Sequence, residues 1–274
     1  RIATVAATLS AHGALPMRIL VLLFAIAMPI VAWLSNNGSF GPDNGTMSDR
    51  YPTLLVAAGY AFAIWGLIFL LDLVYAGWQL SGHRKTDDTL SRIAPWAAAG
   101  FALTAIWMPL FSMAQFWLCL LVIFAATFCL IRCAMILSHD RTPQEGQWLW
   151  AWLPLSLHAG WLSLAAFLNL AQVVVAYQLA STTHQLPWSL VLFALAALML
   201  LMVNLRMRGN IDYVIAALWA LVAVYVKQSD SGLPGAQVAA WVALAIAVVL
   251  VLQTVLLRRR YPGGLLPNPA RAPG

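Results

Sequence analysis

The feature that most constrains this chain is a series of long apolar segments separated by short polar ones. Inside a bilayer, backbone polar groups must be hydrogen-bonded within the protein, which favours helices. About twenty helical residues cross a hydrocarbon core of roughly 30 Å. The pattern predicts an all-α integral membrane protein with about eight transmembrane helices. We expect these helices at about residues 15–34, 53–80, 93–113, 116–137, 148–179, 186–205, 211–226 and 236–257.

Composition supports the same class of protein. Hydrophobic residues make up 62% of the chain and charged residues 9%, and the mean hydropathy is +0.83. A soluble domain carries about 25% charged residues. The net charge of +6 does not indicate nucleic-acid binding, because the basic residues lie at the ends of apolar segments. The expected surroundings are therefore a lipid bilayer, and we expect no nucleic-acid partner.

The distribution of basic residues predicts an orientation. With eight spans, two basic residues, Arg50 and Lys227, lie on one side of the membrane. Cytoplasmic loops are enriched in Lys and Arg, so the richer side is expected to be cytoplasmic, with both termini on it. We expect the inner membrane of a bacterium. The richer side holds the other thirteen: Arg1, Arg18, Arg84, Lys85, Arg92, Arg132, Arg141, Arg206, Arg208, Arg258, Arg259, Arg260 and Arg271.

The segments outside the spans are expected to be irregular. Residues 1–14 are predicted to form an N-terminal extension, with Met17 as an alternative start. The loop of residues 35–52 is dense in Gly, Asn, Pro and Asp, which predicts an irregular, exposed connection. Residues 258–274 are basic and then rich in Pro and Gly, and are predicted to be disordered.

Two ionisable residues within the apolar segments form a candidate intramembrane polar site. Asp72 lies in the second segment and is expected to be functional or to pair, either with Arg132 or with a backbone group. His158, in the fifth segment, is interpreted as a hydrogen-bonded core residue rather than a haem ligand. No Cys or His cluster completes a zinc site, so no metal is expected. Three cysteines of one apolar segment are interpreted as packing residues: Cys119, Cys129 and Cys133.

Of the thirteen tryptophans, three that lie within spans each belong to a patterned stretch. Trp65 is followed directly by a glycine in AFAIWGLIF, Trp107 lies before a proline in FALTAIWMPLF, and Trp161 begins the stretch WLSLAAFLN. Trp161, Ala165 and Asn169 are spaced to share one helix face. Small residues beside indoles are typical either of close helix packing or of space for a flat ligand. Other tryptophans lie near span ends, where interfacial indoles are favoured: Trp33, Trp78, Trp148, Trp150 and Trp188.

In this order, the three stretches resemble the tryptophan-rich sensory protein or translocator protein family (TspO/MBR). The resemblance covers about residues 15–180, which it predicts to be a five-helix bundle, and leaves residues 186–257 as three additional helices, so longer relatives are the better match. The chain departs from the family pattern at Thr104–Ala105 and at Asp72. In the loop after the first helix, only Tyr51–Pro52 approaches the usual Trp-x-Pro-Pro element.

The resemblance implies an apolar cavity for a tetrapyrrole, a sterol or a carotenoid-like molecule, in a protein that acts as sensor, carrier or regulator. No cofactor is certain, and porphyrin or haem is expected as a ligand rather than as a cofactor. The residues that match the family motifs, and that are therefore predicted to contact the ligand, are Trp65, Gly66, Phe69, Thr104, Trp107, Pro109, Phe111, Trp161, Ala165 and Asn169. The alternative for the three indoles is that they only fill the core.

Two other classes of function stay open. A transporter, or a subunit of a larger membrane complex, would use the three additional helices and Asp72, and a homodimer is a further assembly to consider. An enzyme that degrades porphyrin ranks third, because no nucleophile–base pair or paired carboxylate is visible in the sequence. We therefore expect no enzymatic activity. The geometric prediction is that the helices carrying Trp65, Trp107 and Trp161 meet around one pocket, with each indole contributing to its wall or floor.

Overall fold

A computed structural model describes residues 2–261, with side chains from residue 15 onward except that of His83. Eight of its helices are long and apolar enough to cross a membrane, and no strand occurs among the described residues, so the predicted fold class is confirmed. The elements are α1 (Ile2–Asn36), α2 (Asn44–Arg50), a 3₁₀ helix (Gly59–Ala63), α3 (Ile64–Trp78), a second 3₁₀ helix (Gly82–Thr86), α4 (Asp88–Ser112), α5 (Phe116–Ser138), a π-helical turn (Trp148–Trp152), α6 (Leu153–Ala176), α7 (Leu186–Arg206), α8 (Ile211–Ser229) and α9 (Ala236–Arg260).

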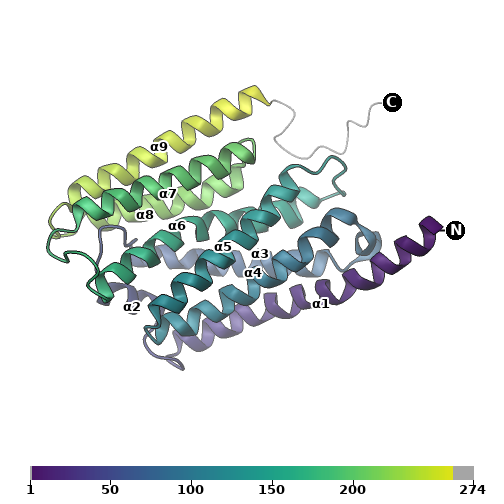
Figure 1. Cartoon of the computed structure of the whole chain (residues 1–274), viewed down its shortest axis with the longest axis horizontal. Coiled ribbons are helices and arrows are strands. Elements are labelled where there is room, and N and C mark those ends of the chain that lie inside the picture. Colours follow the sequence, from purple (N-terminus) through teal and green to yellow (C-terminus); the bar gives the residue numbers. More distant parts are fainter. Residues whose placement is uncertain (1, 262–274) are drawn as a thin grey trace.

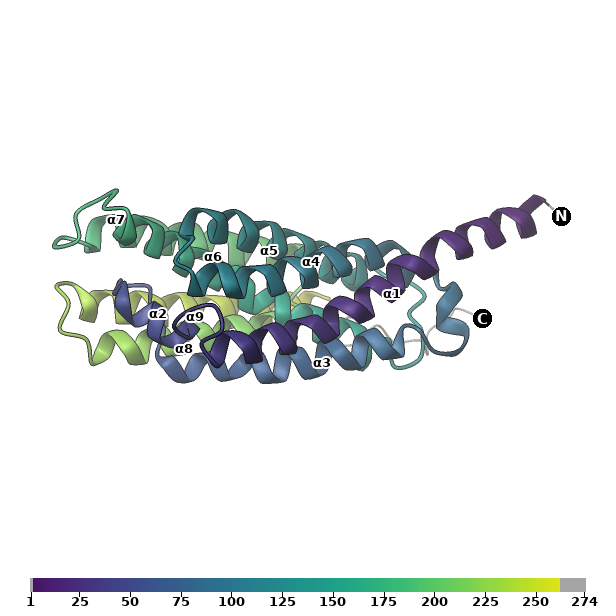
Figure 2. The same cartoon turned by 90° about the horizontal axis from the view of Figure 1, so that it is seen from below.

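The long helices run roughly along one axis (Figures 1 and 2), and they form two groups, of which α7–α9 lie together in Figure 1. In the first group α4 packs against both α1 and α5, α6 packs against α5, and α3 contacts α1 and α6. We call α1 and α3–α6 the five-helix bundle. The second group, α7–α9, joins it mainly through α8, which packs against α6 and α9. We call α7–α9 the added helices.

Gly160 shows how closely α8 approaches the bundle. A Cβ atom at this position of α6 would overlap the carbonyl oxygen of Tyr213 and lie 3.1 Å from the Cβ of Ala216. Two side-chain hydrogen bonds cross the same contact, from Tyr213 Oη to Ser163 Oγ (2.9 Å) and from Asn210 Nδ2 to Ser156 Oγ (2.8 Å). Small residues that let helix backbones approach are typical of packing in membranes.

The predicted second span starts later than expected. Residues 53–57 are buried but not helical, and the first helical turn after them is the 3₁₀ helix at Gly59–Ala63. Gln228 of α8 donates through Nε2 to the carbonyl oxygens of Thr53 and Val56, both at 3.1 Å. Buried backbone outside helices is tolerated where other protein groups satisfy its polar atoms, and Gln228 does so for these two carbonyl oxygens.

The loop of residues 37–52 is more ordered than its composition predicts. Asp43 caps α2, because its Oδ1 accepts hydrogen bonds from the backbone N–H groups of Gly45 (2.9 Å) and Thr46 (3.0 Å). The hydrogen bonds from Thr46, that of its hydroxyl above all, lower the pKa of the Asp43 carboxyl. Met47 and Ser48 of α2 are buried. The expectation of an irregular, exposed loop is therefore wrong for α2.

The structure describes part of each predicted terminal segment. Residues 2–14, predicted to be an N-terminal extension, form the start of α1. At the other end α9 continues through Arg258–Arg260, so the start of the expected disordered tail is helical. The remainder of that predicted tail, residues 262–274, lies outside the described residues.

Candidate functional site

An aromatic cluster around Trp65 occupies the middle of the five-helix bundle. The Trp65 ring lies 6.2 Å from that of Trp107 on α4 and 5.9 Å from that of Trp161 on α6, centroid to centroid. It also stacks on Phe69, at 5.3 Å. All four side chains are at most 8% exposed. The structure thus brings the three predicted indoles together from α3, α4 and α6, with Trp65 in contact with both others.

Hydrogen bonds fix Trp107 in this cluster. Its Nε1–H donates to Asn169 Oδ1 at 2.8 Å, and Asn169 Nδ2 donates to Gln172 Oε1 at 3.4 Å. Gln172 Nε2 in turn donates to Ser48 Oγ at 3.1 Å, which connects α6 to α2. Asn169, predicted to be a polar contact for a ligand, therefore uses both ends of its amide within the protein. Trp107 also stacks on Phe111, at 4.9 Å.

Asp72 and His158 form a fully buried pair beside the cluster. His158 Nδ1 lies 2.8 Å from Asp72 Oδ2, and the His158 ring meets the Trp65 ring edge to face at 5.7 Å. His158 is therefore a hydrogen-bonded core residue, as predicted. The expected pairing of Asp72 with Arg132 is wrong, because Arg132 lies over the ring of Trp96, at 5.8 Å. Arg132 also lines a cleft that is formed by α4, α5, the loop after α5, and α7.

Thr104 lies at the other ring nitrogen of His158. Its hydroxyl donates to the carbonyl oxygen of Gly100 at 2.8 Å and lies 3.4 Å from His158 Nε2. Both ring nitrogens of His158 therefore have a polar neighbour within the protein, Asp72 at Nδ1 and Thr104 at Nε2. Such pairing suits ionisable groups that are buried in an apolar bundle.

Several polar atoms near the cluster have no hydrogen-bond partner among the described residues. They are Trp65 Nε1, Trp161 Nε1, Asp72 Oδ1 and Tyr75 Oη. Buried polar groups are nearly always satisfied by protein, water or ligand. This group of unpaired atoms marks the centre of the bundle as a place that can accept further polar contacts.

A cavity of about 520 Å³ opens on one side of Trp65. Trp65, Gly66 and Phe69 line it, whereas the other predicted ligand contacts lie outside its lining: Thr104, Trp107, Pro109, Phe111, Trp161, Ala165 and Asn169. A Cβ atom at Gly66 would meet no other atom within 4 Å, so this glycine leaves the wall open. The volume falls within the range of about 300–1,000 Å³ typical of small-molecule sites. Trp107 and Trp161 support the wall from behind Trp65.

The sequence did not reveal the other half of the cavity wall. Trp33, Asn36, Asp43, Asn44 and Phe62 line it, together with residues of α1 and Met108 of α4. Trp33, predicted to lie in an interfacial belt, lines the cavity and is 63% exposed. Asn44 Oδ1 is buried and unpaired. The turn-forming composition of the loop was the available signal, because Asn and Asp are typical of turns and place polar side chains beside the ends of helices.

Comparison with known families supplies one match. A family model described as TSPO-like protein matches residues 18–256, which is most of the chain. The match continues through α7 and α8 into α9, well beyond the residues 15–180 whose motifs carry the resemblance. No curated protein and no solved structure matches the chain.

Proposed function

Because this chain belongs to the TSPO-like protein family, we propose that it binds a flat, apolar ligand in the cavity beside Trp65. The ligand class is a tetrapyrrole or another rigid apolar molecule such as a sterol or a carotenoid-like compound. The protein acts by binding, as a sensor, carrier or regulator, and not by chemical turnover.

The observation that carries this proposal is the uneven lining of the cavity. Aromatic rings of Trp33, Phe62, Trp65 and Phe69 form one part of its wall, and Asn36, Asp43 and Asn44 supply polar atoms from the end of α1 and the start of α2. A flat apolar molecule with a polar edge matches such a lining, because rings stack on its faces and the amides bond its rim.

The Asp72–His158 pair limits how a haem would bind here. Both ring nitrogens of His158 are engaged within the protein, by Asp72 and by Thr104. No group of three His, Cys, Asp or Glu residues able to hold a metal occurs in the described part of the chain. The proposed recognition therefore rests on stacking and rim contacts with the macrocycle and does not use His158 as an axial ligand.

Titration of purified protein with protoporphyrin IX tests the proposal, with quenching of tryptophan fluorescence as the readout. Replacing Trp65 with Phe removes part of the stacking wall and is expected to weaken binding about tenfold. Trp241→Phe is the matched control, because Trp241 lies on α9 with 55% exposure, far along the chain from the cavity. It should change affinity less than about twofold. Non-saturable quenching, or equal losses in the two variants, contradicts the proposal.

The Asp72–His158 pair favours a second candidate function, proton-coupled transport. Ionisable pairs buried within transmembrane bundles are typical of proton relays in transporters. On this alternative, substrate flux into proteoliposomes would depend on a pH gradient, and Asp72→Asn would abolish that dependence while retaining ligand binding. Flux that ignores the pH gradient in the wild-type protein would exclude this function.

A further inference from the structure

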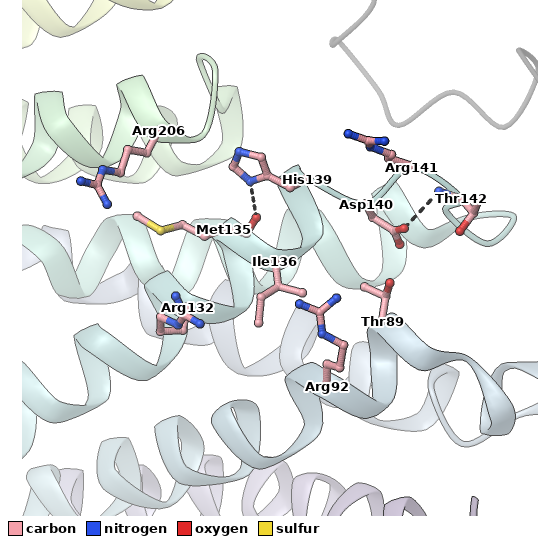
Figure 3. Close-up of a pocket in the computed structure, with 10 residues that line it drawn as sticks. All are labelled: Thr89, Arg92, Arg132, Met135, Ile136, His139, Asp140, Arg141, Thr142 and Arg206. Atoms are coloured by element: carbon pink, nitrogen blue, oxygen red, sulfur yellow. Dashed lines mark hydrogen bonds between the residues drawn. The ribbon is translucent and has the colours of Figure 1, made fainter. Parts of the chain in front are cut away.

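A second cleft, of about 870 Å³, lies away from the aromatic cluster at the end of α5 (Figure 3). Its lining comes from the start of α4, the last turns of α5, the loop after α5 and the end of α7 (Figure 3). The residues are Thr89, Arg92, Arg132, Met135, Ile136, His139, Asp140, Arg141, Thr142 and Arg206. We call this the arginine cleft. The proposed ligand cavity shares no lining residue with it.

The arginine cleft carries an excess of positive charge. None of its four arginines forms an ion pair, since the ion pairs of the described residues are Asp72–His158 and Asp49–Lys227. Asp140 is the only carboxylate in the lining, and both its oxygens are already occupied. They accept from the backbone N–H of Thr142 (3.1 Å, drawn in Figure 3) and from Gln147 Nε2 (2.7 Å). The guanidinium groups are thus available to an anion.

Apolar surface adjoins these arginines on two helices. Phe128 precedes Arg132 by four residues on α5, and Met202 precedes Arg206 by four residues on α7, so each pair shares a helix face. Phe128 is 56% exposed and Met202 50% exposed. Arg132 lies within the α5 span, six residues before its end, or about 9 Å along the axis. Arginines placed there extend toward the headgroup region while their stems stay in apolar surroundings.

We propose that the arginine cleft binds the headgroup of an anionic phospholipid, whose acyl chains lie along the exposed apolar faces of α5 and α7. Guanidinium groups bind phosphate through paired, charge-assisted hydrogen bonds. The positive charge of four guanidinium groups exceeds the single negative charge of one phosphodiester. A lipid with two phosphodiesters, as in cardiolipin, should therefore bind more tightly than one with a single net charge. Basic pockets between transmembrane helices are suited to such headgroups.

A lipid, rather than a soluble phosphate compound, fits the position of the cleft. The arginines stand at the boundary between the exposed apolar residues of the spans and the polar loop at 139–142. A soluble anion would gain nothing from Phe128 or Met202, whereas acyl chains cover such side chains without cost. Inorganic phosphate, which shares only the headgroup chemistry, distinguishes the two sources experimentally.

Lipid binding to the full chain in a mild detergent tests the proposal, with native mass spectrometry as the readout. Cardiolipin should bind more tightly than phosphatidylglycerol, and both more tightly than phosphatidylcholine. The double substitution Arg92→Gln with Arg206→Gln should weaken cardiolipin binding about thirtyfold. The matched control is Lys85→Gln with Arg260→Gln, which removes the same charge from exposed residues outside the cleft lining. It should change binding less than about threefold.

A second measurement uses the unaltered protein. Phenylglyoxal modifies accessible arginines, and peptide mass spectrometry locates the modified residues. Cardiolipin should protect Arg92 and Arg206 but leave Arg260 reactive, and millimolar inorganic phosphate should not displace it. Equal protection by phosphatidylcholine, displacement by phosphate, or an equal loss of binding in the control variant overturns the proposal. Protoporphyrin binding in the cleft variant should stay unchanged, which separates this site from the proposed function.

Discussion

The five-helix bundle and the added helices have opposite kinds of interior. The bundle centre holds three indoles and a fully buried ionisable pair. α8 and α9 pack against each other, and many of the residues that they bury are small: Ala216, Ala217, Ala220, Ala239, Ala240 and Ala243. The first interior is arranged for specific contacts, whereas the second is arranged for close backbone approach. We infer that binding chemistry belongs to the bundle and rigidity to the added helices.

The added helices also contact the segment that leads into α3, residues 49–61. The added helices hydrogen-bond this segment repeatedly, and its end supplies the cavity residues Gly59, Phe62 and Ala63. The added helices therefore brace one wall of the cavity without entering the aromatic cluster. The contacts are Lys227 with Asp49 (2.8 Å), Gln185 with the Pro52 carbonyl (3.1 Å), Gln228 with the Thr53 and Val56 carbonyls (both 3.1 Å), the Ala58 N–H with the Ala223 carbonyl (2.9 Å) and Trp219 with the Ala61 carbonyl (3.0 Å).

The largest effect is expected from breaking the ionisable pair of the bundle. His158→Leu leaves the Asp72 carboxyl buried without its partner and should lower the free energy of unfolding by about 3–5 kcal/mol. Removing both groups, in Asp72→Leu with His158→Leu, should recover most of that loss. Denaturant unfolding in detergent measures both values.

The matched change in the added helices is Asn204→Leu. Asn204 Nδ2 donates to Gln253 Oε1 (2.7 Å) and Thr254 Oγ1 (3.0 Å), so only neutral groups lose a partner. The cost should be about 1–2 kcal/mol. A loss as large as that of His158→Leu would contradict the contrast between the two interiors.

A slightly smaller effect is expected where the two regions touch most closely. Gly160→Ala would place a methyl group against the Tyr213 carbonyl, which is backbone and has no flexible end to move. We expect a loss of about 3 kcal/mol in the free energy of unfolding, at the upper end of ordinary overpacking. Loss of the α6–α8 contact should also appear as faster proteolysis between residues 177 and 185. Wild-type stability in this variant would show that the added helices are not tightly docked.

Gln228→Leu tests whether the added helices support the cavity wall through the segment that leads into α3. Two buried carbonyl oxygens, those of Thr53 and Val56, lose their side-chain donor, which should cost about 2 kcal/mol. Because the freed segment leads to the cavity wall, ligand affinity should fall as well. Gln253→Leu is the control, since Gln253 donates to the Leu201 carbonyl at 3.0 Å within the added helices. It should lower stability by a similar amount and leave affinity unchanged.

The sequence predicted the parts of this fold that depend on length and local pattern. The eight spans followed from hydropathy, and the meeting of Trp65, Trp107 and Trp161 followed from motifs within spans. The non-helical stretch at 53–57 was missed, because its hydrogen bonds come from Gln228, about 170 residues away. An apolar stretch carries no local sign that a distant side chain will satisfy its backbone.

The polar site was only half predictable. Asp72 and His158 were both singled out, but their pairing depends on the rotation of α3 and α6 about their axes, which residue spacing does not supply. A stronger signal was available, because two isolated ionisable groups in neighbouring spans lower their burial cost by pairing. The cavity wall from α1 and α2 was missed for a different reason, since loop residues have no periodicity from which to place them.

The smallest effect on stability, and the sharpest test of the cavity, is expected from Gly66→Ala. The added methyl group would meet no atom within 4 Å, and alanine favours the helix, so stability should rise by at most about 1 kcal/mol. The methyl group projects into space that the ligand would occupy, so protoporphyrin binding should weaken about tenfold. Gly77→Ala on the same helix also meets no atom within 4 Å but lies outside the cavity lining, and should leave binding unchanged. Equal affinity in both variants would mean that the ligand does not lie against Gly66. Gly160 would then still be needed for the close contact between α6 and α8, whereas Gly66 would have no role in ligand binding.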